Sequence, residues 1–116
     1  MKIAIASTKN MVCEHFGYCE KFTIYEIEQE QITNKTEHAN PGHRPGFLPE
    51  FLSNLGVNVI IAGAMGSGAV DHFNEKQIST ILGVSGDVDS VIKKWLSHDL
   101  KSTETVCIEH RHHGDC

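Results

Sequence analysis

The run at residues 57–62 constrains the fold more than any other part of this sequence. It reads Val-Asn-Val-Ile-Ile-Ala, so β-branched residues dominate and Asn58 is its one polar member. A strand of this composition is buried on both faces, which is typical of a parallel sheet covered by helices. The run breaks at the glycine-containing stretch 63–66, and apolar residues then recur at helical spacing. This pattern predicts an α/β fold.

The rest of the chain predicts four further strands and three helices. Residues 21–27 alternate with a period of two, and residues 31–37 are mostly polar, as at the edge of an antiparallel sheet. Glycine or a capping residue marks helix ends at Gly56, Ser67 and Asp87. The predicted elements are strands at 2–6, 21–27, 31–37, 57–62 and 78–82, helices at 47–55, from 67 and at 88–96, and loops at 7–10 and 38–46. The order β-β-β-α-β-α-β-α predicts a three-layer domain with a mixed sheet of five strands, the first three forming a meander.

Length and charge narrow the class of protein. The 116 residues fit one domain, residues 1–100, followed by a Cys- and His-rich tail at 101–116. The net charge is −5 and the basic residues form no run, so nucleic acid is not an expected partner. No apolar stretch approaches the roughly 18 residues of a membrane helix, and the start lacks a signal-peptide core. We therefore expect a cytoplasmic protein without membrane association.

The turn at 63–66 is the first candidate binding feature. Ligands of open α/β sheets bind beyond the carboxyl ends of strands, and free N–H groups at the start of a helix favour an anion. Gly63 and Gly66 allow close approach of a ligand to the backbone, with Ala64 and Met65 between them. The glycine spacing is not that of a dinucleotide-binding fingerprint. A tight strand-to-helix turn without a ligand is the alternative interpretation.

Thiols and imidazoles form two further candidate features. Cys13, His15 and Cys19 follow the first strand and carry donors typical of zinc, copper, nickel or iron sites. Inert thiols and a surface histidine are the alternative. The tail holds five more candidate ligands, Cys107, His110, His112, His113 and Cys116. Their density predicts binding of Zn, Ni or Cu, and a disordered tail that takes up metal loosely is the alternative.

The loop at 38–46 is the fourth candidate feature. Its two Pro and two Gly exclude a helix or a central strand. His43 and Arg44 are expected to reach toward an anion, and a solvated loop is the alternative. No nucleophile–base pair and no pair of catalytic carboxylates emerges from the sequence. We therefore expect a protein that holds a ligand and is not an enzyme.

A series of short motifs runs through residues 1–97. In order, they are Met1-Lys2-Ile3-Ala4-Ile5-Ala6, His15-Phe16-Gly17, Phe22-Thr23-Ile24-Tyr25, Asn40-Pro41-Gly42, the stretch 57–66 and Gly83. Together they resemble the dinitrogenase iron–molybdenum cofactor biosynthesis family, in particular its small stand-alone members. The resemblance implies a ribonuclease H-like fold and a role in binding, carrying or storing metal–sulfur clusters.

The same resemblance implies which residues meet the cluster. It makes His15 a cluster ligand and places the 63–66 turn, with His43 and Arg44, around the anionic cluster. Cys13, Cys19 and the tail are not part of the family pattern, so they leave open a thiolate-ligated cluster or a simple divalent ion.

Three functional hypotheses follow. The first is a non-enzymatic carrier of an Fe–S or Mo-containing cluster, working with cofactor-assembly proteins in a reducing cytosol where Cys13 and Cys19 stay thiols. The second is a metal-buffering or sensing module whose tail binds Zn, Ni or Cu. The third is a redox protein acting through Cys13 or Cys19, which requires an exposed thiol with a low pKa. The sequence leaves the oligomeric state open.

Overall fold

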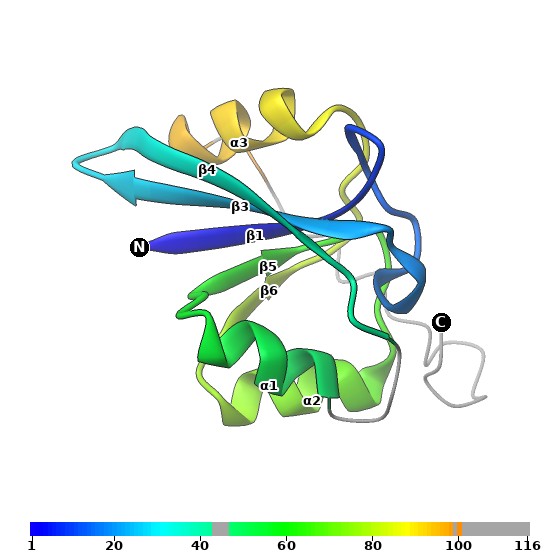
Figure 1. The fold of residues 1–116 in the computed structure, drawn as a ribbon. Coiled ribbons are helices and arrows are strands. Elements are labelled where there is room, and N and C mark those ends of the chain that lie inside the picture. The colour runs from blue at the N-terminus through cyan, green and yellow to red at the C-terminus, as the bar shows by residue number, and fades with distance from the viewer. Residues whose placement is uncertain (43–46, 99, 101–116) are drawn as a thin grey trace.

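A computed structural model describes residues 1–42, 47–98 and 100 of the chain. Two predicted anion-binding residues, His43 and Arg44, lie outside the described residues. So do the five candidate ligands of the tail, Cys107, His110, His112, His113 and Cys116. The described residues form a mixed sheet with helices on both faces (Figure 1).

The sheet contains five main strands and one short one. They are β1 (Lys2–Thr8), β2 (Met11–Val12), β3 (Lys21–Glu28), β4 (Gln31–Ala39), β5 (Val59–Ile61) and β6 (Ser79–Ile81). The main strands lie in the order β4-β3-β1-β5-β6. β1, β3 and β4 form an antiparallel meander, whereas β1, β5 and β6 are parallel. The predicted mixed sheet is thus confirmed, with β4 at one edge.

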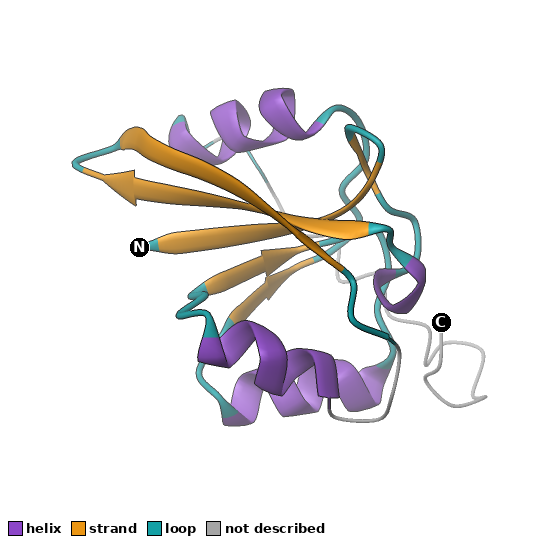
Figure 2. Cartoon of the chain, viewed as in Figure 1, coloured by secondary structure: helices purple, strands orange, loops and turns teal. Residues whose placement is uncertain are grey.

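Helices cover both faces of this sheet. α1 (Phe47–Asn54) and α2 (Ser67–Glu75) pack on one face, and α3 (Val88–Leu96) packs on the other (Figure 2). Alternation along β3 sends Phe22 and Ile24 into the core beneath α1 and α2, and Tyr25 and Ile27 into the core beneath α3. This confirms the three-layer α/β architecture. No helix in the described ranges is long and apolar enough to span a membrane.

Two of the three predicted helix-end signals are confirmed. Gly56 follows α1 with a φ of +83°, a conformation that glycine adopts at low cost. The Asp87 carboxylate accepts a hydrogen bond of 3.0 Å from the N–H of Ser90 and caps α3. Ser67 as the cap of α2 was wrong, because Ser67 already lies inside the helix and Gly66 occupies the capping position.

The predicted loops at 7–10 and 38–46 were wrong in part. β1 continues through Thr8, and the chain turns back at Lys9 to form β2, with Ser7 opposite Val12. Ser7 is a polar residue in a buried strand because its hydroxyl pairs with that of Thr23 at 2.9 Å, a partner that sequence proximity does not reveal. At the other loop, β4 extends to Ala39.

Candidate functional site

The segment between β2 and β3 contains both buried residues and exposed residues. It contains one short 3₁₀ helix, η1 (Phe16–Tyr18). Phe16 is buried against Phe73 of α2, with ring centroids 5.4 Å apart. Glu14, His15 and Tyr18 are exposed, and the rings of His15 and Tyr18 meet edge to face at 6.5 Å. Burial of Phe16 therefore fixes the position of an exposed imidazole next to it.

Backbone hydrogen bonds attach this segment to the turn after β5. His15 and Ala64 form a parallel β-bridge. Its bonds run from Ala64 N–H to the Glu14 carbonyl at 2.8 Å and from Phe16 N–H to the Ala64 carbonyl at 2.9 Å. Gly63 N–H also donates to the Cys13 carbonyl at 3.0 Å. The structure thus brings the predicted ligand His15 directly beside the predicted turn at 63–66.

The glycine at the start of the turn has a packing role. A Cβ atom on Gly63 would lie 2.8 Å from the Glu14 carbonyl oxygen and 3.0 Å from the Cys13 carbonyl oxygen. Real Cβ atoms essentially never approach backbone this closely. Gly63 is therefore required for the contact between the two segments, as the tight-turn interpretation expects.

The start of α2 offers N–H groups three residues after Ala64, the bridge partner of His15. Gly66 is the N-cap, no side chain caps the helix and no acidic residue lies in its first turn. Within the described residues, the N–H groups of Ser67 and Gly68 have no hydrogen-bond acceptor. Unpaired N–H groups and the helix dipole give this end a partial positive charge. The start of α2 therefore favours an anion.

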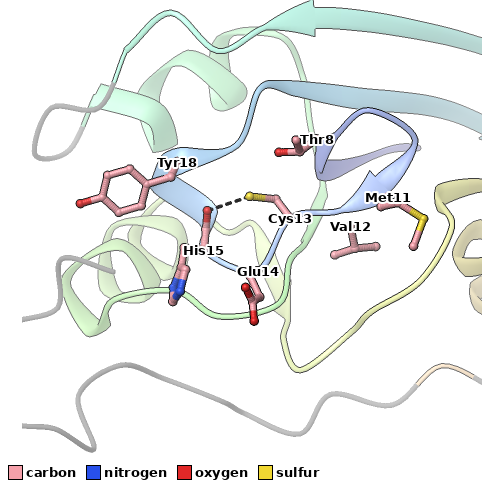
Figure 3. Close-up of a pocket in the computed structure, with 7 residues that line it drawn as sticks. All are labelled: Thr8, Met11, Val12, Cys13, Glu14, His15 and Tyr18. Atoms are coloured by element: carbon pink, nitrogen blue, oxygen red, sulfur yellow. Dashed lines mark hydrogen bonds between the residues drawn. The ribbon is translucent and has the colours of Figure 1, made fainter.

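His15 also lines an open depression of about 520 Å³ (Figure 3). Its lining residues are Thr8, Met11, Val12, Cys13, Glu14, His15 and Tyr18. Met11 is 51% exposed and Tyr18 is 66% exposed, which is unusual for large apolar side chains. Glu14, Met11 and Tyr18 could not be identified as lining residues from the sequence, because their positions depend on how β2 and η1 fold.

The two described thiols belong to the core. Cys13 and Cys19 are free and buried among apolar side chains. The Cys13 thiol donates to the His15 carbonyl at 3.1 Å, as Figure 3 shows. Burial, with a smaller contribution from nearby Cys13, raises the pKa of Cys19 to about 12. This environment disfavours the thiolate that a metal ligand or a redox nucleophile requires at Cys19.

The Asn40 side chain connects the η1 segment to the end of β4 by hydrogen bonds. Its side-chain amide donates to the Cys19 carbonyl at 2.8 Å, and its side-chain oxygen accepts from Gly42 N–H at 2.9 Å. Asn40 begins the Asn40-Pro41-Gly42 motif, but that motif does not reveal its hydrogen-bond partners.

The predicted site residues are therefore brought together in part. His15 lies beside Gly63 and Ala64, whereas the side chain of Met65 is fully buried and leaves only its backbone for a ligand. Among the described residues, no group of three or more His, Cys, Asp or Glu side chains is arranged to hold a metal ion.

The chain is similar to known proteins over most of its length. Residues 1–98 match the family described as dinitrogenase iron-molybdenum cofactor. An uncharacterized protein of Methanocaldococcus jannaschii is 35% identical over 109 residues, which cover 90% of this chain and 92% of the relative. The crystal structure of PH0822 superposes with a TM-score of 0.83 at 30% identity, covering 89% of this chain and 95% of that chain.

The fold recurs in a more distant protein. The apo form of the orange protein from Desulfovibrio gigas has a TM-score of 0.76 at 15% identity, with coverage of 99% of this chain and 96% of that chain. Proteins of the matched family are implicated in binding metal clusters. The match over residues 1–98, the related structures and the motifs from Met1 to Gly83 lead to one conclusion: the chain belongs to the dinitrogenase iron-molybdenum cofactor family.

Proposed function

We propose that this protein is a non-enzymatic carrier that binds a metal–sulfur cluster as cargo. The binding site, which we call the His15 site, consists of His15, the turn at 63–66 and the first N–H groups of α2. The observation that carries the proposal is the β-bridge between His15 and Ala64, because it joins the segment with the exposed imidazole to the turn that leads into the uncapped start of α2. Imidazole is a ligand for iron and copper, and the helix start attracts negative charge.

The donors at the His15 site suit a preassembled cluster better than a bare ion. A structural zinc site needs four protein ligands, and the described residues hold no cluster of even three. A metal–sulfur cluster brings its own sulfide ligands, so one imidazole ligand from the protein and hydrogen bonds from backbone N–H groups can hold it. By the family resemblance, His43 and Arg44, which lie outside the described residues, add donors and positive charge to the same site.

Anaerobic reconstitution tests the proposal. The full chain is incubated with iron and sulfide, or with tetrathiomolybdate and copper, and passed through a desalting column before visible absorption and metal content are recorded. We expect a coloured, stoichiometric complex, and at least about tenfold weaker binding after His15→Ala, equivalent to roughly 1.4 kcal/mol. The matched control is His72→Ala, which removes an exposed imidazole from α2. A colourless wild-type protein, or equal loss in both variants, contradicts the proposal.

Deletion of residues 107–116 separates the carrier from the metal-buffering alternative. That deletion removes Cys107, His110, His112, His113 and Cys116 together. Cluster binding that survives the deletion and is lost in His15→Ala supports the His15 site. Loss of all metal binding on deletion would instead assign the metal to the tail.

A further inference from the structure

The outer edge of β4 is a long exposed strand edge. Eight of the nine residues of Gln31–Ala39 are exposed, and in the described part of the chain no strand pairs beyond β4 (Figure 1). The unpaired N–H and C=O groups of such an edge form a template for another strand. The backbone direction and the charges of β4 determine which strand can pair with this edge.

The hydrogen-bond pattern of the sheet fixes which residues of β4 face outward. Ile27 exchanges both backbone bonds with Met1, at 2.8 Å and 3.1 Å, so its backbone groups point toward β1. By alternation, Ile24 points its backbone groups toward β4, where it lies opposite Thr36. The residues on either side of Thr36, Lys35 and Glu37, therefore direct their N–H and C=O groups to the open edge.

The charges on these two outward positions are opposite. Lys35 and Glu37 are two residues apart, so their side chains lie on the same face of the sheet. Within one chain, Lys35 lies 3.2 Å from Asp89 and Glu37 lies 2.9 Å from Lys21. An antiparallel copy of β4 related by a two-fold axis at Thr36 would place each Lys35 opposite the other copy's Glu37.

Other self-pairings of the same edge are less favourable. An axis at Lys35 would set two lysines directly opposite each other, and an axis at Glu37 would set two glutamates opposite each other. Like charges at directly opposed positions destabilise a strand pair, whereas opposite charges stabilise it. A pairing can form backbone hydrogen bonds only if it opposes two residues whose backbone groups point outward. The axis at Thr36 meets this condition and also places opposite charges across from each other.

We propose that β4 is a homodimer interface in which two copies of this chain pair antiparallel about Thr36. About four backbone hydrogen bonds form at the two Lys35–Glu37 positions. On the α3 face, the charges then alternate from Asp89 through Lys35 to Glu37 and Lys21 of the second copy. The threonine hydroxyls at residue 36 meet on the opposite face. The sheets of the two copies become continuous, and the two His15 sites stay away from the interface.

Complementary charge variants test the register. Sedimentation of the full-length wild type should give a dimer, and K35E or E37K alone should raise the dimer dissociation constant at least about tenfold. An equimolar mixture of K35E and E37K should dimerise again, because acids on one chain then face lysines on the other. Mixing cannot repair the contacts to Asp89 or Lys21, since these lie within one chain. K76E changes an exposed lysine at the end of α2, away from β4, and should leave the dimer dissociation constant unchanged.

Three results would overturn the proposal. The first is a wild type that stays monomeric up to about 1 mM, which would leave the edge to a strand of another protein. The second is a mixture no more associated than its components, and the third is an equal effect of K76E. A disulfide test is independent of charge: Thr36→Cys should give a 36–36 crosslink under mild oxidation, mapped by mass spectrometry. Asn34→Cys should link far more slowly, because residue 34 would face His38 of the other copy.

Discussion

The backbone of Gly63 touches the carbonyl groups of Glu14 and Cys13 too closely for any side chain. We expect Gly63→Ala to destabilise the fold by about 2 kcal/mol, because backbone must shift to admit the methyl group. Gly68→Ala is the control, since a Cβ there meets no atom within 4 Å. It should be neutral or stabilising by about 0.5–1 kcal/mol. Urea unfolding of both variants measures the difference, and equal stabilities would refute the packing role.

The carboxylate of Glu14 is the charge next to His15 that opposes an anionic cargo. It is exposed and extends from the same loop (Figure 3). Because like charges repel even through water, Glu14→Gln should tighten tetrathiomolybdate binding about two- to fivefold at low salt. The gain should shrink at high salt, where the interaction is screened. Titration followed by visible absorption measures both, and weaker binding by Glu14→Gln would mean that Glu14 contributes to the site.

Cys19 should react slowly with alkylating agents. Burial raises its pKa to about 12, so almost no thiolate exists near neutral pH. We expect iodoacetamide to modify Cys19 only on the time scale of unfolding, and urea to accelerate the reaction. Peptide mapping after timed quenching distinguishes it from the other thiols. Fast modification at pH 7 would revive the redox hypothesis.

At the scale of secondary structure, the start of α3 depends on one side chain. The Asp87 carboxylate accepts from Ser90 N–H at 3.0 Å, and the backbone of Val88 donates to Asn10 in the β1–β2 turn. Asp87→Ala should therefore cost about 1 kcal/mol in unfolding free energy. Asp87→Asn should retain most of the stability, because asparagine also caps. Thermal unfolding of the pair tests this, and equal losses would show that the charge of Asp87 matters more than its hydrogen bond.

At the scale of the whole molecule, Tyr25 links the sheet to α3. Its hydroxyl donates to Asp89 at 2.6 Å. This hydrogen bond, aided by Lys35, lowers the pKa of Asp89, while burial and the same bond raise the pKa of Tyr25. The Asp89 contribution to stability is present above about pH 4 and is lost as the pH falls further. The Tyr25 contribution is present below about pH 10 and is lost as the pH rises through its folded value.

Two variants distinguish the loss of stability at low pH from the loss at high pH. Tyr25→Phe should make the loss of stability shallower at both low and high pH, because it removes the shared hydrogen bond and the ionisable phenol. Asp89→Asn should make the loss at low pH shallower and the loss at high pH shallower only in part, because burial still raises the pKa of Tyr25. Denaturant midpoints measured from pH 3 to pH 11 test this, and identical profiles for the two variants would exclude the linkage.

Patterns within short segments predicted most of the elements. The apolar run at 57–62, the alternation in β3 and the cap at Asp87 depend on neighbours in the chain, so the sequence was enough to find them. β2 and the last two residues of β1, Ser7 and Thr8, were missed because Ser7 is buried only through its bond to Thr23. The exposed surface of the candidate site was missed for a similar reason, since it depends on the turn at Lys9.

The five main strands, the three α-helices, their order and the faces they bury were determined by the sequence alone, because periodicity and caps act over a few residues. Tertiary structure decided which of the candidate ligands meet. It buried Cys13 and Cys19 in the core and joined His15 to Ala64 through backbone bonds. Those contacts form between segments far apart in the chain, and their geometry depends on the close backbone packing that Gly63 permits.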